Sequence, residues 1–498
     1  MKKRILSFVL AIVLILVLVP GAFATSNPWS SNDAPSSWAQ SYVREAYNQN
    51  LVPSNLMGRF TQSITRAEFT HLAVALYEEL TGRTITGRVT FTDTDDVNVQ
   101  KMAYLGVVRG VGNNRFNPDG LITREESAAM LVRLANATDV TIPDYSNYTF
   151  ADHDRVSSWA VGYVRQMRLS GIMGGVGNNR FDPMGRYTIE QSITTMLRTY
   201  DHVKFVHSIP DYITIAGVRI PTTADSVSIN GSNGTIWFHE GRVGSANQFR
   251  GQITNECLAP LKQLPYLQRV ILQVIREITD ITPLVEIRNL RTLDLAYMDN
   301  VDITPLSRMM NLRELSIGFS PITDLSPIAG LHNLESLAIH DTQISDLSLI
   351  AGLTNLRSLS LYRNQLRDLT PIAGLMNLEF LFIERNQSSD LTPLAGLTNL
   401  TQLFVTHSNI TDITPLARLT NLVTLILWHN QISDLTPLAS LYNLERLNLQ
   451  NNRISDLTPL AGLMHFDPPR PHVWIQLFDN PITDWSPVSH VDDVRGRP

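Results

Sequence analysis

The stretch Leu444-Glu445-Arg446-Leu447-Asn448-Leu449-Gln450-Asn451-Asn452-Arg453-Ile454 decides the fold of the C-terminal half of this 498-residue chain. Leu447 and Leu449 lie two residues apart, so both side chains point to one face of a short strand. Asn448, between them, points to the opposite face. A single strand of this kind cannot bury its own leucines, so the stretch predicts a fold in which neighbouring copies cover one another.

The copies are present at a fixed interval of 22 residues. An Asn-Leu pair marks each unit, and an aspartate column keeps the same period. The Asn-Leu pairs begin at Asn289, Asn311, Asn333, Asn355, Asn377, Asn399, Asn421 and Asn443, and the aspartates are Asp280, Asp302, Asp324, Asp346, Asp368, Asp390, Asp412, Asp434 and Asp456. The pattern L-x-x-L-x-L-x-x-N-x-L at this period is the signature of leucine-rich repeats.

Stacked repeats predict a continuous leucine core with parallel strands along one side. An asparagine column (Asn364, Asn386, Asn430, Asn452 and Asn480) is expected to bond backbone groups where each strand ends. The strand cores that we expect are Val270–Leu272, Leu293–Leu295, Leu315–Ile317, Leu337–Ile339, Leu359–Leu361, Leu381–Ile383, Leu403–Val405, Leu425–Leu427, Leu447–Leu449 and Ile475–Leu477. The last arrives late because of a proline-rich insertion within Met464–His472.

Residues 226–492 resemble the 22-residue leucine-rich repeats of internalin-like bacterial surface proteins. We expect residues 226–269 to form an N-terminal cap, with short strands at Ser226–Gly234 and Thr235–His239, and residues 270–492 to form the repeats. The resemblance implies a curved α/β solenoid with a parallel sheet, whose concave face binds a partner. It does not identify that partner.

The N-terminal half carries a weaker, threefold repeat. Each copy predicts a helix, a tight Gly/Asn loop and a second helix that starts at a threonine, where an N-cap belongs. The threonines open Thr65-Arg66-Ala67-Glu68, Thr123-Arg124-Glu125-Glu126 and Thr188-Ile189-Glu190-Gln191. The Gly-x-Gly loops lack the lysine and the strand-to-helix setting of a nucleotide site, so they predict turns.

These three copies resemble tandem S-layer homology domains, over residues 27–82, 88–138 and 147–205, with a linker at 206–225. The resemblance implies an α-helical, trimer-type module that binds pyruvylated secondary cell-wall polysaccharide. Arginine suits the pyruvyl carboxylates because it gives charged, bidentate hydrogen bonds. By transfer, the candidate contacts are Arg66, Arg124, Glu68, Trp38 and Trp159. Ile189 replaces the arginine in the third copy, and the residues alone would also fit arginines that make only local ion pairs.

The chain begins with a basic, then apolar, then small-residue pattern over residues 1–24, which predicts a secretory signal peptide. No second apolar run is long enough to span a bilayer, so we expect no transmembrane segment after cleavage. The last residues show no sorting motif with an apolar tail, which favours non-covalent attachment. A single cysteine, Cys257, excludes an internal disulfide and fits an exported protein of a Gram-positive-like bacterium, displayed on the cell wall.

The middle repeats concentrate aromatic and basic residues on the predicted concave face. The expected apolar patch is Tyr362, Phe380, Phe382, Phe404, Ile426 and Trp428, flanked by Arg363, Arg385, His407 and His429. Such clusters are typical of binding hot spots. Two other readings remain open: the aromatic rings pack across strands only for stability, or the histidine pair binds a metal ion, for which a third ligand is missing.

No catalytic motif is present, and the regular aspartates recur once per repeat at a turn, so we expect neither an enzyme nor a bound cofactor or metal. The net charge of −6 argues against non-specific nucleic-acid binding. Two functions fit: an adhesin-like binder carried on the wall, with an unknown protein or glycan partner, or a structural component of the envelope without an external ligand.

Overall fold

The computed structural model describes residues 28–30, 34–144, 150–177, 179–240, 243–462, 474–489, 491 and 493–497. The chain divides into two compact units, with the boundary between His207 and Ser208. We call them the helical unit and the solenoid. The predicted signal peptide at 1–24 and the proline-rich insertion at 464–472 lie outside the described residues.

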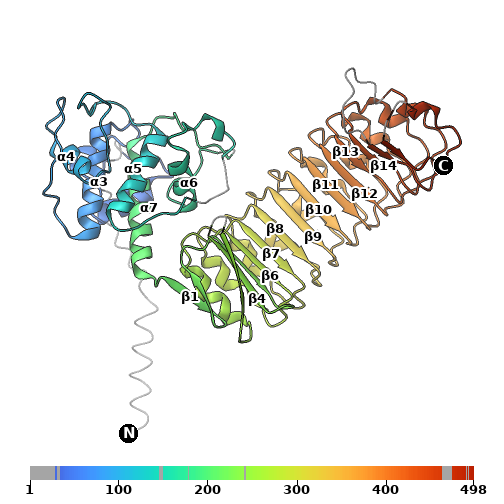
Figure 1. Ribbon diagram of the computed structural model, residues 1–498, viewed down its shortest axis with the longest axis horizontal. Coiled ribbons are helices and arrows are strands. Elements are labelled where there is room, and N and C mark those ends of the chain that lie inside the picture. The colour runs from blue at the N-terminus through green and yellow to red at the C-terminus, as the bar shows by residue number, and fades with distance from the viewer. Residues whose placement is uncertain are drawn as a thin grey trace, which may run out of the picture. The chain divides into compact units, whose positions relative to one another are not determined.

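The helical unit consists of three helix pairs in sequence (Figure 1). Its helices are α2 (Gln40–Asn48), α3 (Arg66–Thr81), α4 (Val97–Tyr104), α5 (Arg124–Ala137), α6 (Val161–Leu169) and α7 (Ile189–Ser208), with short 3-10 turns η2 (Ser54–Leu56) and η3 (His153–Arg155). The predicted helix, loop, helix order is therefore confirmed in each copy. The loop before the second helix is fastened by an aspartate in two copies. Asp93 accepts hydrogen bonds from the backbone N–H groups of Phe116 and Asn117, and Asp152 accepts them from Phe181 and Asp182.

The solenoid is built on one 14-stranded sheet in the order β16-β15-β14-β13-β12-β11-β10-β9-β8-β7-β6-β3-β4-β5. From β6 to β16 all neighbours are parallel, and each residue pairs with the residue 22 positions away through most of the sheet, for example Leu359 with Leu381. The strands are β3 (Ser226–Asn230), β4 (Thr235–Glu240), β5 (Val243–Gln248), β6 (Arg269–Gln273), β7 (Thr292–Ala296), β8 (Glu314–Gly318), β9 (Ser336–His340), β10 (Ser358–Tyr362), β11 (Phe380–Glu384), β12 (Gln402–Thr406), β13 (Thr424–Ile426), β14 (Arg446–Asn448), β15 (Trp474–Gln476) and β16 (Asp493–Arg495).

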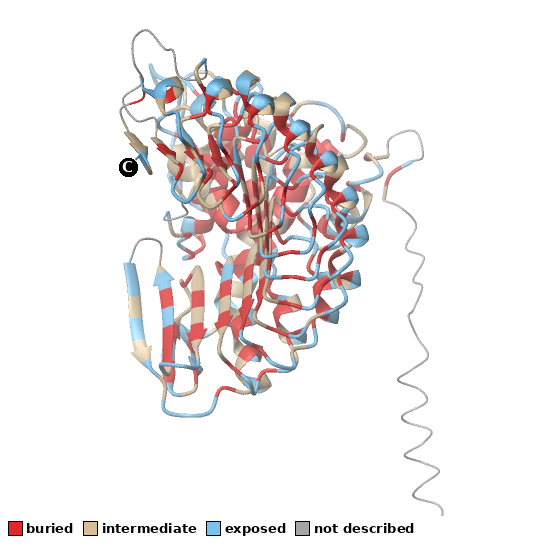
Figure 2. Ribbon diagram, turned by 90° about the vertical axis from the view of Figure 1, so that its right-hand side faces the viewer, coloured by how far each residue is buried: buried red, intermediate tan, exposed pale blue. Residues whose placement is uncertain are grey.

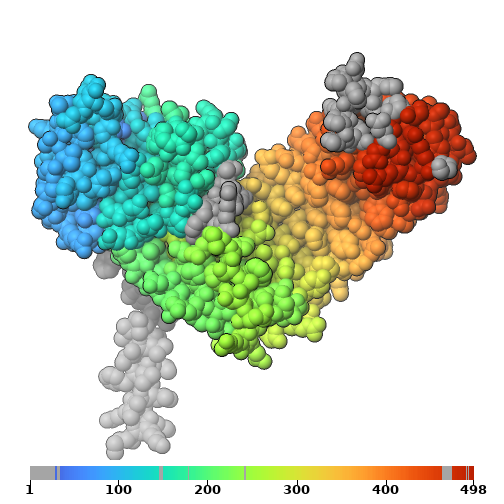
Figure 3. All heavy atoms as spheres, in the orientation of Figure 1, coloured from blue at the N-terminus to red at the C-terminus, as the bar shows by residue number. Residues whose placement is uncertain are grey.

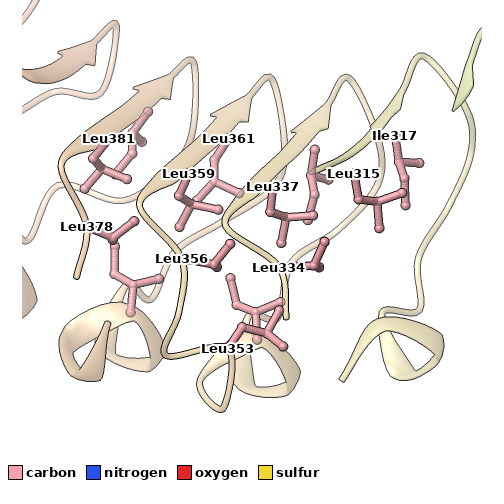
Figure 4. Close-up of a cluster of buried hydrophobic side chains, with 14 of the residues drawn as sticks. Leu315, Ile317, Leu334, Leu337, Leu353, Leu356, Leu359, Leu361, Leu378 and Leu381 are labelled. Carbon is pink, nitrogen blue, oxygen red and sulfur yellow. The ribbon is translucent and has the colours of Figure 1, made fainter. Parts of the chain in front are cut away.

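From β6 onward, each return from strand to strand passes through a short 3-10 helix on the opposite side of the solenoid (Figure 4). The repeated aspartate shapes this turn, because its side chain accepts a hydrogen bond from the backbone N–H two residues later, as Asp412 does from Thr414 at 2.8 Å. The helices are η4 (Asn255–Gln263), η5 (Thr282–Glu286), η6 (Thr304–Arg308), η7 (Ser326–Ile328), η8 (Ser348–Ile350), η9 (Thr370–Gly374), η10 (Thr392–Leu394), η11 (Thr414–Arg418), η12 (Thr436–Ser440), η13 (Thr458–Leu460) and η14 (Ser486–Val488).

The core runs without a break along the solenoid. Leucines of successive repeats, such as Leu337, Leu359 and Leu381, are fully buried and lie side by side in the same place of each coil (Figure 4). The colours of the space-filling view follow one another in sequence order along the solenoid, since each repeat packs against its sequence neighbours (Figure 3). The strand cores expected from the sequence are confirmed for β6 to β12, whereas β13, β14 and β15 each end one residue before the expected core does.

Two asparagine columns tie the coils together. In the predicted column, Asn430 donates to the backbone carbonyls of Val405 and Leu427 and accepts from the N–H of Ile410. The asparagines of the Asn-Leu pairs form a second column, in which Asn421 donates to the carbonyl of Thr398 in the previous repeat. Because both columns satisfy backbone groups that turns leave unpaired, they explain why asparagine recurs at these positions.

The prediction of a linker at residues 206–225 is wrong. Helix α7 continues to Ser208, and a two-stranded hairpin follows, formed by β1 (Tyr212–Ile215) and β2 (Val218–Pro221). One face of this hairpin is apolar, and Ile213, Ile215, Val218 and Ile220 are buried in the solenoid core. The alternating pattern of exposed and buried residues in both strands is that of a half-buried hairpin. The hairpin therefore belongs to the cap of the solenoid.

Candidate functional site

Three of the predicted wall-binding residues, Arg66, Glu68 and Arg124, lie in the first turn of a helix. Thr65 and Glu68 form a reciprocal capping box at the start of α3, and Thr123 and Glu126 form another at the start of α5. The third copy keeps the same arrangement with glutamine, since Thr188 and Gln191 exchange backbone-to-side-chain hydrogen bonds of 3.1 and 3.3 Å. In all three copies, these two positions make the helix start at a defined residue.

The three copies meet in a closed ring of backbone hydrogen bonds. The N–H of Ile64 donates to the carbonyl of Tyr187 at 2.9 Å, Ile122 donates to Ile64 at 3.3 Å, and Tyr187 donates to Ile122 at 3.3 Å. All three side chains are buried. Each copy thus completes the backbone bonding of the next, and the third returns to the first. The helix starts are fixed by the whole unit rather than by one copy.

The structure gives the two candidate arginines internal partners. Arg66 donates to the backbone carbonyls of Phe116 and Arg109 at 3.1 and 2.9 Å, lies 4.9 Å from the Phe116 ring centre, and pairs with Glu126 at 3.2 Å. All of these partners belong to the second copy. The arginine of the first copy therefore holds the loop of the next.

Arg124 repeats this arrangement one copy further along. It donates to the carbonyls of Phe181 and Gly174 at 2.7 and 2.9 Å and lies over the Phe181 ring. Only 7% of Arg124 is exposed, and burial lowers the pKa of its guanidinium, as it does for Arg66. Both guanidinium groups are thus held by residues of the next copy and are largely shielded from solvent. Both arginines therefore fix loops of the next copy, and their direct contact with a wall polymer stays a prediction.

The residue after the arginine position explains where the tryptophans occur. Glu190 accepts hydrogen bonds from the backbone and hydroxyl of Ser36, and Glu125 accepts the same pair from Ser157. Each serine lies two residues before a tryptophan, in Ser36-Ser37-Trp38 and Ser157-Ser158-Trp159. The first copy has Ala67 at the position of these glutamates. By the same pattern, Ala67 of the first copy faces the second copy, and alanine cannot accept a hydrogen bond from a serine. The second copy has neither the serine nor the tryptophan at the corresponding positions.

Trp38 and Trp159 are the predicted contacts that the structure leaves accessible. They are 49% and 51% exposed, although each lies immediately before a helix and beside a serine anchored from another copy. A large aromatic ring held at a fixed place on the surface offers apolar contact area at little entropic cost. Glu68, by contrast, is engaged by Thr65 and by Arg59, whose guanidinium lies 2.7 Å away.

The second predicted site lies on the outward face of the parallel sheet, which we call the strand face. Ser360, Phe382, Phe404 and Ile426 occupy one row of directly paired residues across β10 to β13. The rings of Phe382 and Phe404 are 5.7 Å apart, those of Phe380 and Phe404 are 5.5 Å apart, and Tyr362 lies 6.4 Å from Phe382. The structure thus brings the predicted aromatic residues together as one cluster.

The rings of this cluster are only partly accessible. Tyr362, Phe380, Phe382, Phe404, Ile426 and Trp428 are all half-buried. Cross-strand ring contacts of this geometry also contribute to stability. The rings of this cluster therefore pack against one another across the strands. The part of each ring that stays accessible can still contact a partner.

The basic residues lie next to the aromatic cluster, as expected, but most have acidic neighbours. Arg363 pairs with Asp341 at 3.3 Å and lies 5.2 Å from the Tyr362 ring centre, and Arg385 lies 3.6 Å from Glu384. The line that they form is thus less positive than the sequence suggested.

The two histidines of this line stack on each other. The rings of His407 and His429 are 4.5 Å apart at 14°, and Trp428 meets His407 edge-on at 4.7 Å. Burial, followed by the charges of His429 and Arg385, lowers the pKa of His407. Among the residues that the structure describes, no group of three or more His, Cys, Asp or Glu side chains is placed to hold a metal ion.

The sequence analysis missed a second pair of rings on the same side of the solenoid. Tyr297 and Phe319 stack at 4.1 Å and 5°, and Tyr297 is 47% exposed. Both occupy the repeat position that Arg363, Arg385, His407 and His429 occupy further along. The signal for this pair is the 22-residue period itself, which places Tyr297 and Phe319 in the same column as these four residues.

Known proteins resemble the two units separately. A family model described as "Leucine Rich repeats (2 copies)" matches residues 311–352, 354–396 and 420–462, and one described as "S-layer homology domain" matches residues 90–128. The protein therefore carries leucine-rich repeats and an S-layer homology domain. It is a cell-surface, cell-wall-associated protein.

Individual relatives match parts of the chain. An endoglucanase of Bacillus sp. (strain KSM-635) is 28% identical over 274 residues, or 51% of this chain and 29% of the relative. A surface layer protein of Brevibacillus choshinensis is 28% identical over 22% of this chain and 10% of its own length. The crystal structure of an internalin (inlF) from Listeria monocytogenes is 34% identical over 50% of this chain and 72% of that chain, with a TM-score of 0.44. The chain thus spans less than a third of the endoglucanase and of the surface layer protein.

No helix within the described part of the chain is long and apolar enough to cross a membrane.

Proposed function

We propose that the helical unit holds the protein on the cell wall without a covalent bond, by binding a pyruvylated secondary polysaccharide, and that the strand face of the solenoid captures a protein or glycan partner. The protein would then act as an adhesin-like binder and not as an enzyme. The observation that carries this proposal is the aromatic cluster with its adjoining basic residues on the strand face, from Tyr362 to His429. Clusters of aromatic residues and arginine dominate the binding energy of many interfaces.

Wall binding is supported by the two exposed tryptophans and their anchored serines. In this proposal Trp38 and Trp159 contact the polymer directly, whereas Arg66, Arg124 and Glu68 keep the loops and helix starts in place.

Sedimentation with purified cell walls tests the wall-binding half of the proposal. We expect the full chain to sediment with intact walls and to stay in solution with walls from which the secondary polysaccharide has been extracted. The double variant Trp38→Ala, Trp159→Ala should lose most of its binding. Tyr104→Ala is the matched control, because this ring is 58% exposed at the end of α4 and lies outside the proposed contacts. Equal binding to extracted walls would refute the proposal.

Glycan arrays and protein pull-downs test the strand face. We expect Trp428→Ala to reduce capture of a partner at least tenfold, while Phe478→Ala, a 43% exposed ring further along the solenoid, leaves it unchanged. Because the Trp428 ring packs against His407 and His429, its removal should also lower the melting temperature slightly. If no external ligand is captured and only neighbouring wall components are, the structural role in the envelope is the correct one.

A further inference from the structure

The 14-stranded sheet has an open edge at its N-terminal end. Strand β5 is the last in the strand order and pairs with β4 alone, and no described strand lies on its outer side. Its residues are exposed or half-buried throughout, and it forms the outermost strand of the cap (Figure 2). An uncovered edge strand presents a row of unpaired backbone N–H and C=O groups, which can pair with another chain.

The register fixes which backbone groups are unpaired. The N–H of Phe249 donates to the carbonyl of Gly234 at 3.0 Å, and this pair continues the register in which Asn247 opposes Ile236. Residues of an antiparallel pair alternate between bonding inward and facing outward. Ser245 and Asn247 therefore bond to β4. The backbone groups of Gly244, Ala246 and Gln248 point away from the sheet.

This edge lacks the features that usually prevent strands from pairing between molecules. Val243–Gln248 contains no charged residue and no proline. Apolar side chains are also left accessible there: Val243 is 69% exposed, and Trp237, which is paired with Ala246, is 45% exposed. Natural edge strands are commonly protected by lysine, proline or a covering element, so an unprotected edge indicates that it is covered by a partner.

We propose that β5 is a dimerisation edge, on which the β5 strand of a second copy of this chain adds in antiparallel orientation about a twofold axis at Ala246. In this register Gly244 faces Gln248 of the other copy, and the three outward residues of each strand exchange hydrogen bonds. Val243 lies opposite Phe249, a half-buried ring, on the side of the sheet that faces the core. Val243 and Phe249 lie on the same face of the strand. A twofold axis therefore forms the Val243–Phe249 pair twice, once on each side of Ala246.

The neutrality of the strand favours a second copy as the occupant. Two identical strands bring identical charges together, which is destabilising when the residues directly opposite are charged. Here the residue on the axis is alanine. Trp237 of each copy is paired with Ala246, and both side chains point to the sheet face opposite the core. A small residue between two large rings leaves room for both strands to approach to the usual spacing of about 4.8 Å.

The oligomeric state of the chain from residue 25 onward tests this proposal. We expect sedimentation velocity to show a monomer–dimer equilibrium that shifts towards dimer as the concentration rises. Ala246→Pro should abolish the dimer, because it removes the outward N–H on the axis. An edge strand tolerates proline at such a position, so the variant should keep the melting temperature of the wild type. A monomer at all concentrations, or a dimer that survives Ala246→Pro, would overturn the proposal.

Two further variants keep the test decisive if the proline disturbs the cap. Ala246→Lys places two ammonium groups against each other on the axis and should weaken dimerisation at least tenfold. Ala338→Lys is the control, since it makes the same change on the same sheet face at β9, away from the edge, and should leave the dimer intact. In a Cys257→Ala background, Ala246→Cys should form a disulfide-linked dimer under mild oxidation. Loss of dimer with Ala338→Lys, or no cross-link through position 246, would count against this edge.

Discussion

At the scale of single residues, the arginines of the helical unit act over long sequence separations. Arg66 and Arg124 reach loops 43 to 57 residues away, and each ends between backbone carbonyls and a phenylalanine ring. A guanidinium suits this position because its planar fork donates to several carbonyls while its face covers the ring. The motif that the sequence displays as a surface signature is thus also a structural joint between copies.

Replacing Arg124 with alanine should destabilise the helical unit. The change leaves the carbonyls of Phe181 and Gly174 without their donor in a buried place, which costs about 2–3 kcal/mol. Thermal unfolding of the full chain measures the effect, with Arg115→Ala as the control, because 61% of the Arg115 side chain is exposed in the loop that precedes α5. An equal loss of stability in both variants would contradict the assigned role.

The sequence predicted the threonine N-caps but not what lies around the arginines. Thr65 and Glu68 are three residues apart, so their contact is set by helix geometry alone. The contacts of Arg66 depend on how the second copy closes onto the first through the backbone ring of Ile64, Ile122 and Tyr187. This closure joins residues that are far apart in the sequence, so no local sequence pattern indicates it.

At the scale of structural elements, a residue with left-handed backbone follows each strand from β6 to β15, within three residues of its end. Val274, Tyr297, Phe319, Asp341, Arg363, Arg385, His407, His429, Asn451 and Asp479 have φ angles of 49–58°. Among residues other than glycine, asparagine and aspartate tolerate this conformation best, whereas other side chains lower the stability of the fold there. Most of the repeats nevertheless carry an aromatic or basic residue there. This choice favours a role for these side chains in binding, because stability alone would favour asparagine.

Arg385→Asn should therefore stabilise the solenoid while weakening partner capture. Relief of the left-handed backbone is worth roughly 1 kcal/mol, and the exposed ion pair with Glu384 contributes less than that. Chemical denaturation should show a higher unfolding midpoint. The same change at Arg446, an exposed residue inside strand β14, should bring no gain, since its backbone is extended. A lower midpoint for Arg385→Asn would disprove the argument.

The aspartate column should make the solenoid sensitive to acid. Hydrogen bonds from the hydroxyl and backbone N–H two residues later lower the pKa of Asp302, Asp324, Asp368, Asp390, Asp412, Asp434 and Asp456. The sign follows from the depressed folded-state values: the stabilisation is complete above the unfolded pKa of about 3.9 and is lost as the pH falls through the folded values.

Melting temperatures between pH 6 and pH 2 measure this dependence. We expect a steep fall below about pH 4, and a smaller fall when Asp412 and Asp434 are both changed to asparagine, which keeps the acceptor oxygen without the titration. Asp294 acts in the opposite direction, because burial raises the pKa of this residue on the strand face. A melting temperature that is constant down to pH 2 would contradict the prediction.

The strands were predictable because their leucines repeat every 22 residues, whereas the β1–β2 hairpin was not. Its turn is Ala216-Gly217, with φ angles of 47° and 82°. A turn of this kind is normally marked by asparagine before glycine. Alanine at the first position hides the signal, and the hairpin has no counterpart elsewhere in the chain that a repeat search would detect.

At the scale of the whole molecule, the stability of the solenoid depends on contacts between successive repeats. Leu425→Ala should cost about 2–5 kcal/mol, since this fully buried leucine packs against both neighbouring coils. Urea unfolding measures the loss. Leu349→Ala is the control, because Leu349 is 39% exposed at a position where most repeats have proline. Comparable losses in the two variants would argue against a continuous core.

The unbroken 22-residue register also bears on how such a gene changes over generations. Units of equal length and register lie in tandem, so recombination between them can delete or duplicate a whole coil without shifting any side chain to the wrong face. Each gain extends the protein by one strand spacing, about 4.8 Å, and adds another row of variable surface positions. Length and ligand preference can therefore diverge between strains in single steps, while the two ends of the chain remain the same.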